Sequence, residues 1–312
     1  MPCQLSVVSP VYGCVGCLED LVDRIAAAVV SLGTEFEVIL VDDGGPGEPW
    51  ARIVELAANR PWLRGIRLSR NFGQHNAITA GLAESRGLRV VVLDCDLQDP
   101  PEAIPVLLAE AERGPDVVFA RRLNRRDGLF KRLLSWGFYR VLSWLTKIPH
   151  DHSTANFGVY SRRAIDAVLA MPESERFFPS LVRWTGYSVS TVDVQHSPRE
   201  DGRSGYSLRR LLSLAGSIIL AYSDRPLRFV VGIGGLFSLT AFILAGIAVV
   251  RYLHGDIQVA GYTSIIASIW LVGGASIACL GVIGLYVGRI FVHAKRRPHY
   301  LIASRTDSAN DV

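Results

Sequence analysis

Short β-branched runs alternate with helical stretches from Leu5 to Ala120, and this alternation constrains the fold more than any other feature of the chain. The strand-like runs are Leu5–Val8, Phe36–Val41, Leu63–Leu68, Val90–Leu93 and Val117–Phe119. The stretches between them, near Leu18–Leu32, Trp50–Ala58, Asn76–Ser85 and Ala103–Arg113, have helical length and periodicity. A series of this kind indicates βαβ units, in which the strands run parallel. We therefore predict an α/β fold with a mostly parallel sheet.

Polar motifs follow four of these strands. They are Ser9-Pro10-Val11-Tyr12, Asp42-Asp43-Gly44-Gly45, Ser69-Arg70-Asn71-Phe72-Gly73 and the stretch from Asp94 to Gln98. The carboxyl ends of strands form the ligand crevice of open α/β sheets, so we expect the functional site there. A dinucleotide-dependent dehydrogenase is set aside, because no Gly-x-Gly-x-x-Gly follows the first strand and Asp42 and Asp43 would repel a pyrophosphate.

Asp94 and Asp96 stand one residue apart, directly after the apolar run that ends at Leu93. Carboxylates are hard oxygen ligands and suit a divalent cation that also binds a diphosphate. Taken alone, such a pair is as often a turn or a helix cap. Its position at the sheet edge leads us to predict that Asp94 and Asp96 bind Mg²⁺ or Mn²⁺.

Two long segments near the C-terminus, Phe229–Val250 and Thr263–Gly288, contain no charged residue. Each exceeds the roughly 20 residues that a transmembrane helix needs. Buried helices of a globular core are the alternative. We predict two transmembrane helices within 225–292, a catalytic domain at 1–224 and a tail at 293–312.

The cations around these segments predict their orientation. Arg225 and Arg228 precede the first, a basic group including Arg296 follows the second, and the loop from Tyr252 to Tyr262 has none. Because positive residues stay on the cytoplasmic side, we place the catalytic domain and both termini in the cytoplasm. The net charge of +4 is modest and partly juxtamembrane, which favours contact with a lipid bilayer and not with nucleic acid.

Two further segments, 128–147 and 208–222, combine apolar and basic residues. This composition is typical of amphipathic interfacial helices, although helices packed on the sheet would show a similar pattern. The five cysteines are odd in number and have no framework spacing, which predicts free thiols in a reducing compartment. Cys14 and Cys17 have metal-ligand spacing but lack a second pair.

With these motifs in view, the chain resembles the family 2 glycosyltransferases of the GT-A fold. It is most similar to the polyprenyl-phosphate glycosyltransferases related to dolichyl-phosphate mannose synthase. The resemblance is carried by Val41–Gly44, Leu68–Gly73, Asp94–Glu102 and the paired apolar segments. It implies a GT-A, Rossmann-like sheet and an inverting transfer of a sugar from a nucleotide sugar to a polyprenyl (undecaprenyl-type) phosphate. Such a reaction takes place at the cytoplasmic face of the bacterial inner membrane and serves cell-envelope glycans.

The expected site residues fall into three groups. The catalytic and metal-binding group is Asp96, Asp94, Gln98 and Asp151, with the metal on Asp96 and Asp94. The nucleotide-sugar group is Pro10, Tyr12, Asp42, Asp43, Arg70 and Asp94. The lipid-phosphate group is Arg121, Lys131, Arg199 and Arg203. An acceptor phosphate is mostly dianionic at neutral pH, because its second pKa is near 6, so positioning cations matter more than a strong base.

The chain departs from the family pattern at two positions. Asn156 stands where an aspartate is common, and Gly205 stands where a lysine is common. These departures keep a second hypothesis open, a non-catalytic membrane subunit that binds a nucleotide sugar or a partner protein. A processive polysaccharide synthase is a third, disfavoured because two helices cannot enclose a polymer channel. The sequence leaves the sugar, and whether the chain forms a homo-oligomer, undecided.

Overall fold

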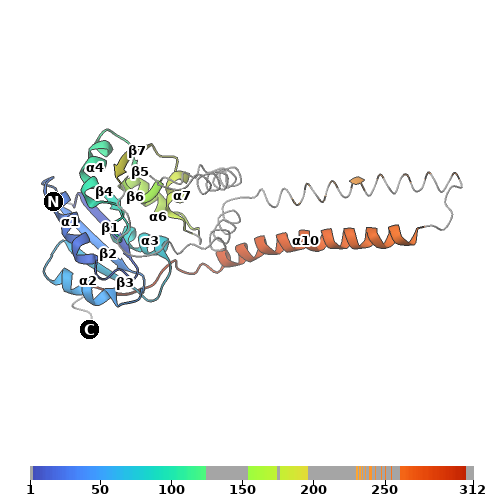
Figure 1. Cartoon of the computed structure of the whole chain (residues 1–312), viewed down its shortest axis with the longest axis horizontal. Coiled ribbons are helices and arrows are strands. Elements are labelled where there is room, and N and C mark those ends of the chain that lie inside the picture. The colour runs from blue at the N-terminus through green and yellow to red at the C-terminus, as the bar shows by residue number, and fades with distance from the viewer. Residues whose placement is uncertain are drawn as a thin grey trace. The chain divides into compact units, whose positions relative to one another are not determined.

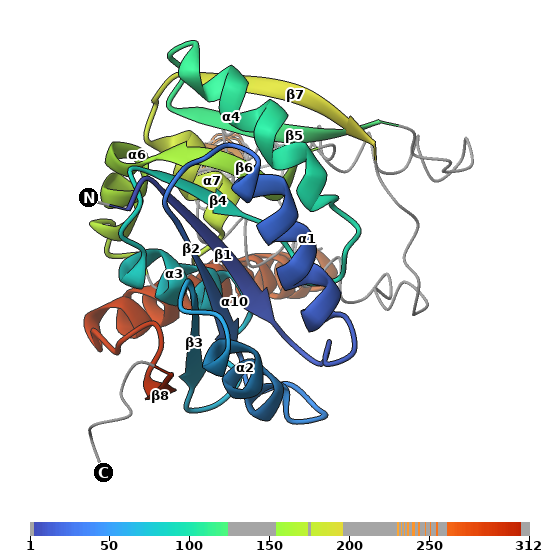
Figure 2. The same cartoon turned by 90° about the vertical axis from the view of Figure 1, so that its left-hand side faces the viewer.

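The computed structural model is built around an eight-stranded sheet with the order β7-β5-β6-β4-β1-β2-β3-β8 (Figures 1 and 2). It describes residues 3–123, 154–173, 176–195 and 261–306, together with single positions between 230 and 254. The strands are β1 (Leu5–Val11), β2 (Phe36–Asp42), β3 (Leu63–Leu68), β4 (Arg89–Val92), β5 (Val117–Leu123), β6 (Thr154–Ser161), β7 (Val189–Gln195) and β8 (Ile302–Arg305).

Most strand pairs in this sheet are parallel. Strand β1 runs parallel to β2 and β4, β2 to β3, and β5 to β7. Strand β6 is antiparallel to β4 and β5, and β8 is antiparallel to β3. The predicted α/β fold with a mostly parallel sheet is therefore confirmed.

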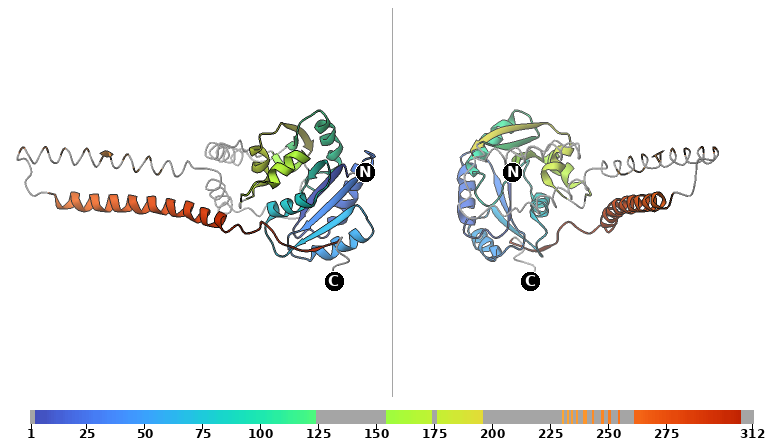
Figure 3. Two further views of the ribbon diagram at one scale, coloured as in Figure 1. Left: turned by 180° about the vertical axis from the view of Figure 1, so that it is seen from behind. Right: turned by 45° about the vertical axis from the view of Figure 1, so that its right-hand side comes forward.

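Helices cover both faces of the sheet. They are α1 (Leu18–Val30), α2 (Pro49–Ala58), α3 (Gln74–Glu84), α4 (Ile104–Glu112), α6 (Arg162–Leu169) and α7 (Phe178–Trp184), with a short 3₁₀ turn, η1 (Pro101–Ala103), before α4. Helices α1, α2 and α4 lie on one face, and α3, α6 and α7 lie on the other (Figures 2 and 3). Because both faces are covered, every residue of β1 is buried, as expected for a central parallel strand.

The sequence explains why α1 packs where it does. Leu18, Leu21, Val22, Ile25 and Val29 recur at helical spacing and are all buried. They pack into the hydrophobic core beneath the sheet together with apolar residues of β1 and β2. The predicted helix of this region is thus present and faces the core.

Strand β6 separates two strands that follow each other in the chain. It comes from a later part of the chain and lies between β4 and β5, so these two strands are not neighbours. Tyr160 of β6 is fully buried and its ring packs edge-on against Phe119 of β5 and Phe178 of α7. Aromatic packing of this kind contributes to holding the inserted strand.

The C-terminal segment contains a strand that the sequence did not predict. Within the predicted tail at 293–312, Ile302–Arg305 forms β8 at the edge of the sheet beside β3 (Figure 2). Thr306 continues the contact, since its N–H donates to the Gly65 carbonyl and the Gly65 N–H donates to its Oγ1 at 2.9 Å. Four residues are too short a run for periodicity to reveal.

The second compact unit comprises Leu142–Lys147 and Tyr206–Arg296 and contains α10 (Tyr262–Ala294). Within the described part of the chain, one helical segment, Val272–Ala294, is long and apolar enough to cross a membrane. Of the other predicted span, the described positions from Val230 to Val250 are helical. The predicted interfacial helices at 128–147 and 208–222 lie outside the described residues.

Candidate active site at the carboxyl edge of the sheet

Three loops meet closely where β1, β2 and β3 end. Gly44, with φ of +66°, lies against the backbone of Arg70 and Asn71, and a Cβ there would come within 3.1 Å of the Asn71 nitrogen. At Gly45 an added Cβ would lie 2.3 Å from the backbone nitrogen of Gly13. Larger residues would therefore separate the loops, which explains the paired glycines after Asp42-Asp43.

The side chain of Asp42 is buried at the end of β2. The Gly44 N–H donates to its Oδ1 at 3.0 Å, and Arg67 Nε lies 3.7 Å from its Oδ2. Burial raises the pKa of Asp42 above its ordinary value, although the bonds from Gly44 and the nearby Arg67 oppose the shift. Asp42 closes its own turn while it stays at the sheet edge.

The side chain of Asp43, equally buried, fixes the next loop. The N–H of Phe72 donates to its Oδ1 at 2.7 Å, and the N–H of Gly73 donates to its Oδ2 at 2.9 Å. Its pKa is also raised, chiefly by burial. These bonds anchor the segment that leads into α3, so Asp43 sets the position of the first turn of that helix.

Asp94 follows β4 and receives two side-chain amides. Gln74 Nε2, from the first turn of α3, donates to Asp94 Oδ1 at 2.7 Å. Asn156 Nδ2, from β6, lies 3.4 Å from the same oxygen. Sequence reasoning did not single out Gln74, and it read Asn156 only as a departure from the family pattern.

Asp96 lies in a tight turn that completes the Asp-x-Asp motif. The Gln98 N–H donates to Asp96 Oδ1 at 3.3 Å, and Leu97 between them has a φ of +57°. Bulky residues rarely adopt this left-handed conformation, and strain of this kind concentrates at functional sites. Asp99 next in the turn is buried.

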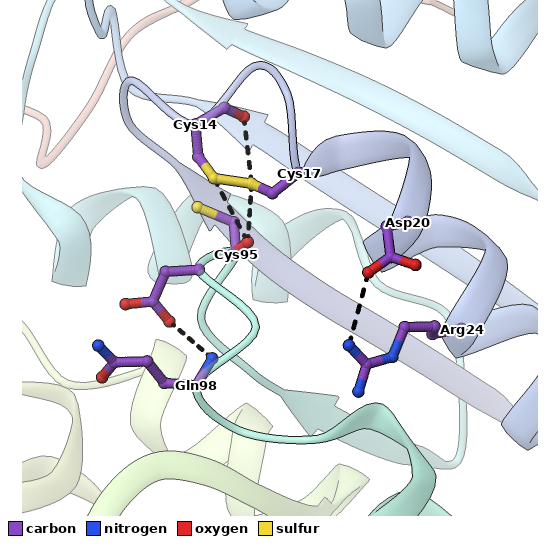
Figure 4. The surroundings of a disulfide bond; sticks show 7 residues. Cys14, Cys17, Asp20, Arg24, Cys95 and Gln98 are labelled. Carbon is purple, nitrogen blue, oxygen red and sulfur yellow. Dashed lines mark hydrogen bonds and ion pairs between the residues drawn. A yellow bond between two sulfur atoms is a disulfide. The ribbon is translucent and has the colours of Figure 1, made fainter. Parts of the chain in front are cut away.

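A pair of cysteines lies against the backbone between the two acids (Figure 4). Cys14 and Cys17 form a disulfide, and their Sγ atoms lie 3.7 and 3.1 Å from the Cys95 carbonyl oxygen. The predicted free thiols are therefore wrong for this pair, whose spacing lets both side chains meet in the loop before α1. Cys95 itself is buried with a free thiol, and burial raises its pKa to about 11.

The other residues expected to bind the nucleotide sugar lie at the same edge of the sheet. Pro10 is the sixth residue of β1, opposite Val41, and not part of the following loop as expected. It is tolerated inside a central strand because β4 ends opposite Val8. Tyr12 is 58% exposed just beyond β1. Arg70 is exposed, donates to the Asn71 carbonyl at 3.2 Å and stacks over the Phe72 ring at 4.2 Å.

The expected lipid-phosphate residues are mostly outside the described part of the chain. Lys131, Arg199 and Arg203 lie there, as does Asp151. Arg121 is described and forms a two-point ion pair with Asp193 of β7, with distances of 2.5 and 2.9 Å. A phosphate that binds Arg121 would have to compete with this carboxylate.

The metal prediction rests on two carboxylates. Among the described residues, no group of three or more His, Cys, Asp or Glu side chains could hold a metal ion. Mg²⁺ does not need such a cage, because it commonly binds through one or two carboxylates and completes its shell with phosphate oxygens and water. The carboxylate oxygens of Asp94 and Asp96 at this sheet edge therefore fit the predicted divalent cation.

Comparison with known proteins adds the family. The model of glycosyl transferase family 2 matches residues 6–169, which include every motif of the sheet edge described above. An undecaprenyl-phosphate 4-deoxy-4-formamido-L-arabinose transferase from Proteus mirabilis is 36% identical over 96% of this chain and 93% of its own length. An uncharacterized glycosyltransferase from Synechocystis is 31% identical over 97% of this chain and 96% of its own.

Among solved structures, the chain is similar to glucosyl-3-phosphoglycerate synthase from Mycobacterium tuberculosis in complex with Mn²⁺, UDP and phosphoglyceric acid. The TM-score is 0.51 at 18% sequence identity, covering 70% of this chain and 76% of that one. At this identity the likeness concerns the fold alone, and it agrees with the expected GT-A architecture.

Proposed function

Because the chain belongs to glycosyltransferase family 2, we propose that it transfers a sugar from a nucleotide sugar to a polyprenyl phosphate at the cytoplasmic membrane face. Several relatives that match over more than nine-tenths of their own length are named as undecaprenyl-phosphate 4-deoxy-4-formamido-L-arabinose transferases. The observation that carries the proposal is that one chain has both the Asp94 and Asp96 carboxylates at the sheet edge and an apolar helix that could anchor the enzyme.

The donor site follows from the sheet edge. Tyr12, exposed beyond β1, offers a ring face for a nucleobase, and Asp42 offers a carboxylate for hydrogen bonds from the base or ribose. Arg70 is exposed and its guanidinium suits a diphosphate. Asp43 has each carboxylate oxygen bonded to a backbone N–H, so we assign it to positioning α3 and no longer to the base.

The departing group is a nucleoside diphosphate, whose negative charge grows as the glycosidic bond breaks. A divalent cation held by Asp96 and Asp94 would neutralise that charge. The solved structure of similar fold holds Mn²⁺ with UDP, which supports a cation of this class. Gln98, whose N–H holds the Asp96 carboxylate, belongs to the same turn.

The acceptor needs little activation by the protein. A phosphate monoester is mostly dianionic at neutral pH, so its oxygen can attack the anomeric carbon without prior proton removal. The chain's task is to hold that phosphate in line with the donor, and cations serve this purpose. Arg199, Arg203 and Lys131 stay our candidates, with Arg121 secondary because of its pairing with Asp193.

The path of the chain supports two membrane crossings. Helix α10 ends at Ala294, and β8 of the catalytic sheet begins at Ile302. The residues between them, 295–301, reach about 25 Å when fully extended, which is less than the roughly 30 Å hydrocarbon core. If α10 spans the membrane, its C-terminal end is therefore on the side of the sheet.

The N-terminal strands belong to that same sheet, so, on the same condition, we propose a second crossing between 196 and 261. The segment Phe229–Val250 is the charge-free run in this interval that is long enough. A cysteine placed at Gly255 should react with an impermeant maleimide added outside intact cells, whereas one placed at Ser308 should react only after permeabilisation. External labelling at position 308, or none at position 255 before lysis, would contradict the topology.

The proposed activity can be tested directly. Purified full-length protein would be incubated with undecaprenyl phosphate, Mn²⁺ or Mg²⁺ and a panel of labelled nucleotide sugars. The panel should include nucleotide-linked 4-deoxy-4-formamido-L-arabinose, because this sugar is in the relatives' names. We expect one donor to give a labelled, organic-extractable lipid that carries a single sugar. A polymeric product would instead indicate a processive synthase, and donor binding without turnover would indicate a non-catalytic subunit.

A further inference from the structure

We propose that Gln74 and Asn156 form an amide clamp that holds the Asp94 carboxylate in place for the donor complex. Both are positioning residues, since they act through Asp94 and contact no reacting atom. The inference rests on the proposed function, because it assigns these two residues to the donor site of the glycosyl transfer. Its observations are the two amide nitrogens at 2.7 and 3.4 Å from one Asp94 oxygen.

The sheet register places the first amide. In the antiparallel pair of β4 and β6, Val91 lies opposite Val159 and Val92 opposite Gly158. Continuing this register by two residues brings Asp94 opposite Asn156. Directly opposed residues of neighbouring strands project to the same side, so Asn156 is held where it can donate to Asp94.

The backbone at Asn156 is itself fixed from the core. The Tyr160 hydroxyl donates to the Asn156 carbonyl at 2.8 Å, and the Tyr160 side chain is fully buried. Burial raises the pKa of Tyr160, so the hydroxyl keeps its proton and stays a donor. Asn156 thus extends from an anchored strand and not from a free loop.

The second amide comes from the opposite side of the site and is anchored independently. Asp43 accepts the N–H groups of Phe72 and Gly73, the residues immediately before α3. Gln74 is the first residue of that helix, so the bonds that set the loop also direct its side chain to Asp94. Two elements far apart in the sequence therefore converge on one oxygen.

Neutral amides have a particular effect on a carboxylate that must bind a cation. Their N–H groups stabilise the anionic form and restrict the side-chain rotamer, but they add no charge that would repel a metal. The Asp94 side chain is then already ordered in the free enzyme, so binding of the nucleotide sugar loses less side-chain entropy. A carboxylate at 74 or 156 would instead place like charge beside Asp94.

The clamp can be tested in the free, full-length protein in detergent. Tm would be measured in two double-mutant cycles. The first uses Gln74→Ala, Asp94→Ala and the variant with both changes. The second uses Asn156→Ala, Asp94→Ala and the variant with both of these changes. If the side chains interact, the Tm of the double variant falls by less than the sum of the two single shifts, by about 3–12 °C for a charge-assisted bond in a domain of this size. Additive shifts in both cycles would overturn the clamp.

Binding of Mn²⁺–UDP, measured by calorimetry, tests its purpose. We expect Gln74→Ala and Asn156→Ala each to weaken binding about tenfold, and Gln74→Glu, which has the same shape, to weaken it further because of like charge. Asn76→Ala is the matched control: its amide lies in the same turn but donates to the Phe72 carbonyl, so binding should change less than about twofold. Equal losses in the control, or unchanged binding in all variants, would overturn the inference.

Different results would contradict the amide clamp and the proposed donor site. Coupling in the free protein without any Mn²⁺–UDP binding by the native chain would leave the clamp in place and remove the proposed donor site for this ligand. Normal Mn²⁺–UDP binding with additive unfolding shifts would keep the donor site and remove the clamp.

Discussion

The central sheet and α10 are both rich in apolar side chains, but those of the sheet are buried and many of those of α10 are exposed. Val7 of β1 and Val91 of β4 are 0% exposed, whereas Ile277 and Leu280 of α10 are 72% and 66% exposed. Exposed apolar surface costs about 25 cal/mol per Å² in water, so a long helix that is apolar on every side suits a hydrocarbon solvent. The difference fits the two tasks that we propose, chemistry at the sheet edge and membrane anchoring by α10.

The largest effect that would test this separation is expected at Asp96. Asp96→Asn keeps the side-chain shape but removes the charge, so kcat should fall about 10²–10³-fold, the scale for losing one electrostatic partner of the transition state. The measurement is sugar transfer to undecaprenyl phosphate. Retention of the variant in washed membranes should equal that of the native protein. Full activity would remove Asp96 from the proposed cation site.

The reverse separation is tested in α10. Ile277→Lys places a charge in the middle of the apolar run, which costs about 2.5–3.5 kcal/mol at the centre of a bilayer. We expect less of this variant in carbonate-washed membranes. Val292→Lys is the matched control, because a lysine near the end of the helix can extend its amine to the interface. Equal retention of both variants would contradict a membrane position for Ile277.

A smaller effect concerns the opposite end of the sheet, where β4 and β5 begin. Asp116 is buried and accepts bonds from Arg163, Ser161 and Ser188, with the Arg163 Nη2 contact at 2.7 Å. The Arg163 bond is the main cause that lowers the pKa of Asp116 to about 2. Because the folded pKa lies below the unfolded value, this carboxylate stabilises the fold above about pH 4, and the gain is lost as the pH falls towards 2.

Asp116→Asn should therefore lower the free energy of unfolding by about 2 kcal/mol at pH 7, and the difference from the native protein should shrink as the pH approaches about 2. Denaturant unfolding at several pH values measures it. Asp193→Asn is the control, since its pair with Arg121 is solvent-exposed and such pairs contribute little. A difference for Asp116→Asn that is independent of pH would exclude its ionisation as the cause.

The smallest effect sharpens the link between the two regions, because β8 follows α10 along the chain. Thr306→Val removes the Oγ1 that accepts the Gly65 N–H at 2.9 Å. The loss of one such bond, about 1 kcal/mol, should lower Tm by about 2–4 °C. Ser304→Ala, a change of similar size on β8, should lower it by less than half as much. Equal shifts would mean that the Thr306 bond does not hold the segment.

Local pattern was sufficient for much of the fold. The strands β1 to β5 and the helices α1 to α4 lie where the alternating runs predicted them, within a few residues at each end. The motifs after those strands fell on one sheet edge because parallel strands point their carboxyl ends the same way. The sequence could therefore place Asp94, Asp96, Asp42 and Asp43 at this edge.

The tertiary structure decided the contacts that join distant segments. Strand β6 enters between β4 and β5, and only this insertion brings Asn156 to Asp94 across a long stretch of sequence. Gln74 reaches the same oxygen because Asp43 fixes the start of α3, and β8 completes the sheet from the far end of the chain. Periodicity reports which face of an element is apolar, whereas the partner of each element depends on how all of them share one core.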